Sequence, residues 1–225
     1  LRFEPVEFAK IALILVFAEY FSRRHIGIAH FQYIAASFFL FLIPGMIVVF
    51  QPDLGSALVL LSIWVGFLLV SGLPPRRVLL GLFFLPFMLG FLWTFVLKPY
   101  QKERILGVFY PEKNALGINY NVIQSKIAIG SAGFLGKGYA QGSQTELGFL
   151  PVPESDFIFA ALVEEWGLLG GVLILAAFLF LILRIIKVGR EAPQNFEKFI
   201  ALGTAIMFTV QFFLNVGSAI GLSPV

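Results

Sequence analysis

The sequence predicts an all-α integral membrane protein, built as a polytopic helix bundle. Of its 225 residues, 59% are hydrophobic and only 13% are charged, and the mean hydropathy is +0.91. A water-soluble domain normally carries about a quarter charged residues. Surface-to-volume scaling also leaves a soluble chain of this size unable to bury so much apolar surface. The 27 phenylalanines fit helices that face lipid better than a compact soluble core.

Six apolar segments approach the roughly 20 residues that a helix needs to cross a bilayer. They cover residues 5–21, 31–50, 55–71, 78–97, 156–186 and 199–216. Pro44 is expected to kink the second segment and Pro86 the fourth, because proline removes a backbone donor and clashes with the preceding turn. We expect one membrane domain over residues 1–225, truncated at both ends and inactive on its own.

Lysine and arginine predict the orientation, because short cytoplasmic loops are enriched in them. The 16 basic residues divide equally between the two sides of the predicted bundle. Most of those on one side fall in a single long loop, residues 98–155, and long loops carry little weight in this rule. We therefore place the short basic loops in the cytoplasm and residues 98–155 outside it.

This long loop is predicted to carry amphipathic helices. Tyr120, Ile123 and Ile127 recur at helical spacing, which indicates a helix over residues 119–129. Together with the aromatic residues of the loop, this helix favours a segment that lies on the membrane surface. A solvated loop with an incidental helix is the alternative.

Charge and cysteine content exclude several classes of function. The net charge of +3 is too small to indicate nucleic acid binding, although it is compatible with an anionic lipid surface. The absence of cysteine excludes disulfides and thiolate metal sites within this chain. The two histidines, His25 and His30, have no carboxylate cluster beside them, so no metal site is predicted.

Asp156 is the sharpest candidate for chemistry. It follows Pro151 and Pro153 and precedes an apolar run, which places a carboxylate at the outer start of a membrane helix. Position alone favours a helix cap, because Ser155 or Asp156 could accept orphan backbone N–H groups and an anion suits the helix dipole. Catalysis is the second interpretation.

Glu164 and Glu165 follow on the same predicted helix. If the helix is continuous from Asp156, they lie about 12–14 Å below that residue, and about 80° and 180° around the axis from it. Ionisable groups at such depth usually face a cavity or a partner. A structural polar contact is favoured over a substrate role.

Other charged residues have ordinary structural interpretations. Asp53 lies in a Pro-Asp-Leu-Gly turn, and Glu4 and Glu7 stand where caps of the first helix are expected. The cluster from Lys98 to Arg104 fits interface anchors with snorkelling side chains. It could equally hold a diphosphate, since arginine binds phosphate through paired hydrogen bonds and lysine as a point charge.

The glycine-rich run over residues 130–138 is not a nucleotide phosphate loop. Ser131 stands where that loop needs glycine, Gly138 stands where it needs serine or threonine, and no strand precedes the run. These glycines predict tight turns or a close approach of the backbone to a ligand.

Several motifs together resemble the SEDS family of bacterial cell-wall synthesis, which includes RodA, FtsW and SpoVE. The resemblance runs nearly end to end and rests on FQPDLG at 50–55, KPYQKERI at 98–105, YNVIQSKIAIGS at 120–131, GKG at 136–138, LGFLP at 147–151 and SDFIFA at 155–160. The YNVIQSK run and the GSQ at 142–144 favour the elongation branch, RodA, over the division branch, FtsW.

The resemblance implies ten transmembrane helices with both termini in the cytoplasm, of which this chain matches helices four to nine. It implies a multi-pass protein of the bacterial inner membrane and an inverting glycosyltransferase that polymerises lipid II into glycan strands. The expected partners are lipid II, the nascent strand, membrane lipids and a class B penicillin-binding protein, with no nucleic acid.

The resemblance also implies site residues. Asp156 matches the family's catalytic aspartate and would act as general base, with undecaprenyl diphosphate as the leaving group. Glu154 and Ser155 stand where the family commonly has histidine and threonine. The expected substrate-binding residues are Lys98, Tyr100, Gln101, Arg104, Gln124, Lys126, Lys137, Gln144 and Ser155. A divalent cation, Mg²⁺ or Mn²⁺, could assist, although the sequence has no dedicated ligand set.

Two other functions compete with the enzyme. A lipid II transporter would suit kinked helices and intramembrane glutamates, but such a transporter needs its site near the bilayer midplane. A scaffold that only recruits a transpeptidase leaves the polar residues of the long loop unexplained.

Overall fold

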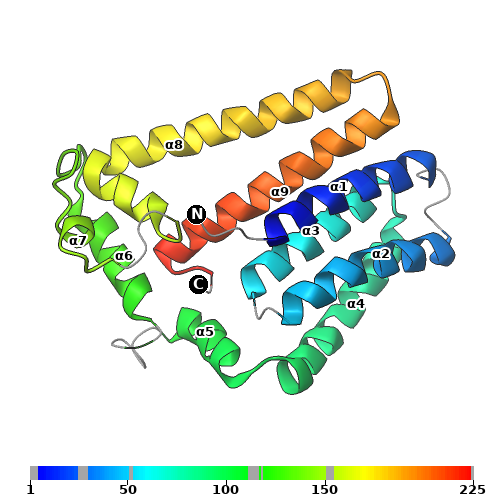
Figure 1. The fold of residues 1–225 in the computed structure, drawn as a ribbon, viewed down its shortest axis with the longest axis horizontal. Coiled ribbons are helices and arrows are strands. Elements are labelled where there is room, and N and C mark those ends of the chain that lie inside the picture. Colours follow the sequence, from blue (N-terminus) through cyan, green and yellow to red (C-terminus); the bar gives the residue numbers. More distant parts are fainter. Residues whose placement is uncertain are drawn as a thin grey trace. The chain divides into compact units, whose positions relative to one another are not determined.

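The computed structural model describes residues 5–24, 30–50, 53–110, 117, 119–150 and 155–223, and the regular structure in these ranges is all helical (Figure 1). The predicted all-α class is therefore confirmed. The chain divides into two compact units, Leu1–Leu92 with Leu181–Gln211, and Trp93–Phe180 with Phe212–Val225. The two long C-terminal helices, α8 (Ile158–Glu191) and α9 (Asn195–Ile220), contribute to both units.

The first unit contains α1 (Pro5–Arg24), α2 (Phe31–Phe50), α3 (Leu54–Val70) and α4 (Pro75–Phe91), and helices α1 to α3 pack on one another. Their core is aromatic: the ring of Phe67 lies 5.5 Å from those of Phe17 and Phe21 and 5.9 Å from that of Phe199, between centroids. Phe17, Phe21 and Phe67 have no exposed surface. Close aromatic packing of this kind contributes to the stability of the first unit beyond the area it buries.

Helix α4 differs from the others because it buries none of its residues. Its side chains after Arg76 and Arg77 are nevertheless apolar, and Leu79, Phe83 and Phe87 are each more than 60% exposed. Such a helix fits contact with lipid or with other helices in a membrane. A single π-helical turn, η2 (Leu92–Val96), follows it.

The six predicted spans are all helical, but not all of these helices are long and apolar enough to cross a membrane. Among the described residues, four helices are long and apolar enough to cross a membrane: Phe31–Val48, Pro75–Val96, Ile158–Glu191 and Asn195–Ile220. Helix α3 has 17 residues, and its Gly55–Val70 stretch is apolar but short. Helix α1 has 20 residues but carries acidic and basic side chains at both ends. Pro44 and Pro86 lie within α2 and α4, and both helices continue past them.

The second unit contains α5 (Pro99–Phe109), α6 (Tyr120–Ser131), α7 (Ser143–Glu146), the start of α8 and the end of α9. Helix α6 confirms the helix predicted over residues 119–129. The face it buries is unexpected, because the buried residues are the small Ser125 and Ala128, whereas Ile127 is 45% exposed. Small residues let α6 approach the end of α9, where Ser125 Oγ donates to the carbonyl of Ala219 at 2.7 Å.

Helix α8 is broken at Gly167, which has φ 72° and ψ −174° and is visible as a change of direction in Figure 1. The helix also begins at Ile158, so Asp156 precedes it. The continuous helix assumed for placing Glu164 and Glu165 is therefore wrong. Residues 168–191 alone rise about 36 Å, enough to cross a hydrocarbon core of about 30 Å. The segment of α8 before Gly167 is not needed for spanning.

Candidate functional site

The carboxylate of Asp156 is exposed and lies just before the first turn of α8. Among the described residues, the hydrogen bond it accepts comes from Ser155 Oγ, 3.1 Å from Oδ1. Asp53 provides a contrast, because its Oδ1 accepts from the backbone N–H of Ser56 at 3.1 Å and caps α3. Asp53, which the sequence predicts as a turn residue, therefore caps α3, whereas the described contacts of Asp156 are not those of a helix cap.

The backbone around Asp156 is held by α9. Asn215 Nδ2 donates to the carbonyls of Ser155 and Asp156 at 3.0 and 3.3 Å. Ser218 Oγ lies 3.5 Å from the Asp156 carbonyl and donates to the Asn215 carbonyl at 2.7 Å. The next residue, Phe157, is 1% exposed. The bonds from α9 and the burial of Phe157 thus hold the main chain, while the carboxylate remains exposed.

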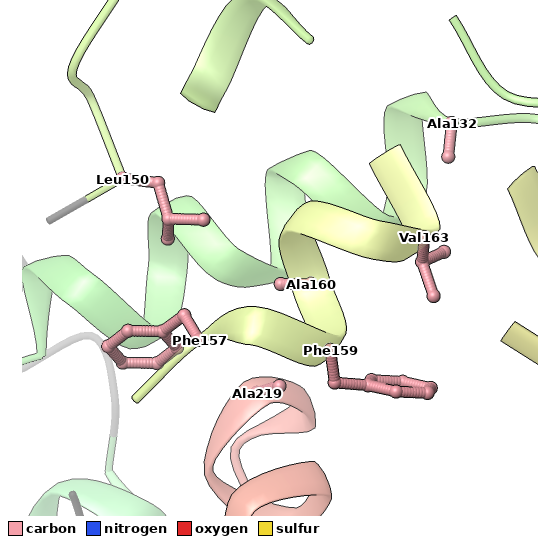
Figure 2. Packing of buried hydrophobic residues seen from close by; sticks show 7 residues of the cluster. All are labelled: Ala132, Leu150, Phe157, Phe159, Ala160, Val163 and Ala219. Atoms are coloured by element: carbon pink, nitrogen blue, oxygen red, sulfur yellow. The ribbon is translucent and has the colours of Figure 1, made fainter. Parts of the chain in front are cut away.

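A small apolar cluster holds Phe157 in position (Figure 2). The cluster contains Phe157, just before α8, and Phe159, Ala160 and Val163 from the first part of α8, together with Ala219 of α9, Ala132 and Leu150. Each of these side chains is at most 9% exposed. Close-packed side chains have little room to adjust, so a shift of one residue moves its neighbours. The position of Asp156, next to Phe157, therefore depends on the whole cluster.

Asn215 and Ser218 were not predicted from the sequence. The signal that could have found them is an amide and a hydroxyl three residues apart on one face of the apolar second half of the helix. Polar side chains inside membrane helices usually hydrogen-bond to a neighbouring segment, and here that segment carries Asp156.

Two predicted substrate residues, Gln124 and Lys126, lie on α6 near the same end of α9. Ser125, between them, bonds to Ala219, and the exposed Lys126 lies beside Gly221. Gln124 is half-buried. The last two turns of α9 thus contact both the segment that carries Asp156 and the helix that carries Lys126.

The residues predicted from α5 divide into two groups. Lys98, Tyr100 and Arg104 are exposed, and the Arg104 guanidinium lies 5.9 Å from the centre of the Tyr100 ring. Gln101 is only 6% exposed, and its Oε1 accepts from the Lys98 backbone N–H at 3.0 Å. The Gln101 side chain therefore satisfies the first turn of α5, while the other three remain accessible.

Lys137 and Gln144 belong to a different cluster, around the buried Glu164. Lys137 Nζ lies 2.7 Å from Glu164 Oε1, and the Gln144 backbone N–H donates to the same oxygen at 2.9 Å. Gln144 Oε1 is buried, with no hydrogen-bond partner within the described part of the chain. The structural contact predicted for Glu164 is confirmed. Glu165 makes a weaker one, accepting from the Ala140 N–H at 3.3 Å.

A second polar pair lies in the first unit, and the sequence predicts it only in part. Lys10 is 2% exposed and forms an ion pair with Glu7, whose Oε2 lies 3.4 Å from Gln211 Nε2. From the sequence, Glu7 is expected as a cap, and Lys10 contributes only to the predicted orientation. Burial of an ammonium group in an apolar helix marks this pair as functionally interesting. Glu4 lies outside the described residues, as do Pro151, Pro153 and Glu154.

The comparisons with known proteins decide the family. A family model described as "Cell cycle protein", FTSW_RODA_SPOVE, matches residues 1–225. The chain belongs to this family. It is 36% identical over 231 residues to a protein of Escherichia coli (strain K12) named peptidoglycan glycosyltransferase MrdB, covering 100% of this chain and 60% of that protein. It is 35% identical over 225 residues to stage V sporulation protein E of Bacillus subtilis (strain 168), covering 99% and 60%.

A solved structure agrees with this membership. It was described under "Structural coordination of polymerization and crosslinking by a peptidoglycan synthase complex", and it matches with a TM-score of 0.79 and 35% identity. The match covers 100% of this chain and 62% of that one. The chain therefore spans about 60% of the length of these relatives. The resemblance to the SEDS family is confirmed, and the chain is a multi-pass membrane protein of a bacterial family.

Proposed function

We propose that the full-length protein containing this chain polymerises lipid II into glycan strands during cell elongation. The observation that carries the proposal is Asp156: an exposed carboxylate, not engaged as a helix cap in the described structure, on a backbone that Asn215 fixes. Relatives that share over a third of its residues are named peptidoglycan glycosyltransferases. The family match and the exposed polar residues of the second unit support the same reaction.

In the proposed reaction Asp156 acts as general base. It accepts the proton of the acceptor sugar's 4-hydroxyl, and that oxygen attacks the anomeric carbon of the lipid-linked donor with inversion. The bond to undecaprenyl diphosphate breaks, and the leaving group keeps the electron pair. Lys98, Arg104 and Lys126 are proposed to stabilise its developing charge, because cations aimed at such charge usually give large rate effects. Tyr100, Gln124 and Ser155 are the proposed polar contacts to the sugars.

A divalent cation is proposed only as an ion that binds together with the substrate's diphosphate. The residues that the structure describes contain no group of three or more His, Asp or Glu side chains suited to a metal ion. Those residues therefore do not form a metal-binding site by themselves. Mg²⁺ commonly binds one or two carboxylates together with substrate phosphates, so Asp156 and the diphosphate could share one.

The proposed location follows from charge. The short basic loops would lie in the cytoplasm and residues 98–155 outside it, where lipid-linked precursors are polymerised. The proposed partner is a class B penicillin-binding protein, which cross-links the strands. The similar solved structure comes from a complex described as coordinating polymerization and crosslinking, which supports this pairing.

The test is polymerisation by purified full-length protein with lipid II in detergent, alone and with its partner. We expect glycan polymer, because an enzyme needs no membrane across which to move its substrate. A transporter would instead move lipid II across vesicles and make no polymer. A protein that binds the transpeptidase but yields no polymer in either condition would be a scaffold. Depletion that makes rod-shaped cells round supports the elongation role, whereas filamentous cells would indicate the division-specific FtsW type.

Asn215 offers a more specific prediction. Replacement of Asn215 by leucine removes the donor that holds both the Ser155 and Asp156 carbonyls. We expect kcat for polymerisation to fall about 10- to 100-fold, since a misplacement of about 1 Å at a reacting group can cost 10²-fold. Ser218→Ala removes a 3.5 Å contact to Asp156 and the 2.7 Å bond to the Asn215 carbonyl but leaves both Asn215 donations in place, so it should change kcat less than about threefold. Equal effects of the two changes would contradict this role for Asn215.

A further inference from the structure

Glu164 is the most deeply buried carboxylate among the described residues, with 0% of its surface exposed. Its two oxygens are fully engaged. Besides Lys137 Nζ and the Gln144 N–H, Thr145 donates to Oε2 through its backbone N–H at 3.2 Å and its hydroxyl at 2.8 Å. A buried charge persists only when it is paired and hydrogen-bonded in this way. Gln144 and Thr145 lie on α7, and Lys137 lies in the loop that precedes it.

The main chain makes a second connection between the same two segments. The break in α8 leaves carbonyls before Gly167 and N–H groups after it without helical partners. The loop at residues 133–138 supplies partners for two of each. The Lys137 and Gly138 N–H groups donate to the carbonyls of Glu164 and Glu165, each at 3.0 Å, and the carbonyls of Gly133 and Phe134 accept from Leu168 and Leu169 at 3.0 and 3.2 Å.

The segment held by these contacts is the one that presents Asp156. Residues 158–166 form a short helix between Asp156 and the break, and Val163, next to Glu164, belongs to the cluster that packs Phe157 (Figure 2). The short helix is therefore anchored at its start by Asn215 and at its end by the loop. Loss of the second anchor would let it shift, and Asp156 with it.

We infer that Lys137 and Glu164 form a latch that positions Asp156, and that Lys137 acts through Glu164 and not on the substrate's diphosphate. Lys137 is 24% exposed, and its ammonium group already bonds to Glu164 and, at 2.8 Å, to Ser143 Oγ. This reassigns a residue predicted to bind substrate. The inference rests on the proposed polymerisation, because it names positioning residues for that reaction.

Kinetic measurements on the full-length protein with lipid II distinguish a positioning role of Lys137 from direct binding of substrate by Lys137. We expect Glu164→Gln and Lys137→Met each to lower kcat at least about tenfold with KM within twofold. The double variant should be no slower than the slower single variant, because residues that act as one unit are not additive. Lys137→Arg should retain most activity. Glu165→Gln, a matched change at the neighbouring carboxylate, should stay within twofold of the unmodified protein.

Two kinetic results would overturn the inference. One is a Lys137→Met variant with raised KM beside a Glu164→Gln variant of normal kcat. The other is a double variant whose loss equals the product of the two single losses, since independent contacts multiply.

A second measurement does not depend on activity. This chain contains no cysteine, so a nitroxide label on Glu146→Cys, in full-length protein whose other cysteines are replaced by serine, reports on α7 alone. The label should become clearly more mobile with Glu164→Gln and stay unchanged with Glu165→Gln. Unchanged mobility in both would overturn the latch. If the unmodified protein makes no polymer, the proposed function fails, and the label still decides whether the latch exists.

Discussion

Asp156→Asn is expected to lower lipid II polymerisation by about 10²- to 10⁴-fold, the usual contribution of a general base. The amide has nearly the shape of the carboxylate but cannot accept the proton of the attacking hydroxyl. The carbonyl groups that Asn215 holds belong to the main chain and survive the change. We therefore expect kcat to fall, with normal membrane levels and little change in KM.

The matched control is Asp53→Asn. Asp53 is also an exposed aspartate at the start of an apolar helix, but its carboxylate caps α3 through the Ser56 N–H. Asparagine caps helices as well as aspartate does, so this variant should retain full activity. Polymerisation by purified full-length protein is the measurement. Normal activity of Asp156→Asn would remove Asp156 from the mechanism, whatever the control shows.

The sequence was sufficient for the helical segments because their signal is local. Apolar runs predicted α2, α4, α8 and α9, and helical spacing of Tyr120, Ile123 and Ile127 predicted α6. Asp53 was predicted to have a structural role in a turn, and the cap that the structure shows is equally local, since it joins residues three positions apart.

The arrangement around Asp156 could not be predicted because its contacts are distant in the chain. Asn215 reaches a carbonyl 60 positions away, and the Lys137–Glu164 pair spans 27 positions. The amino-acid composition does not show which polar residues will form hydrogen bonds or ion pairs with one another. The motif resemblance identified Asp156 but gave no reason to separate Lys137, which is engaged with Glu164, from Lys126, which is exposed.

The break in α8 is the clearest case in which contacts between distant segments determine the local structure. Gly167 is followed by Gly170 and Gly171, and nothing local indicates which of the three interrupts the helix. The glycines at residues 130–138 were expected to allow tight turns or approach to a ligand. Part of their role is instead an approach to this chain's own backbone at Gly167.

Gly167→Ala is expected to cause a large loss of stability. The residue has φ +72° and ψ −174°, a conformation almost confined to glycine, and forcing alanine into it costs about 1–3 kcal/mol. A Cβ atom there would also overlap the backbone of Phe134, Leu135 and Gly136, which no side-chain rotation can relieve. Together these effects should exceed about 3 kcal/mol, the upper end of the usual loss for a single substitution.

Gly148→Ala separates the two contributions. Gly148 has the same φ of +72°, but a Cβ built on it meets nothing within 4 Å. That variant should lose only the conformational term, about 1–2 kcal/mol. The measurement is the midpoint of thermal unfolding of full-length protein in detergent. A Gly167→Ala midpoint as high as that of Gly148→Ala would mean that the loop does not approach the break in α8 closely, and the docking of residues 133–138 on α8 would have to be abandoned.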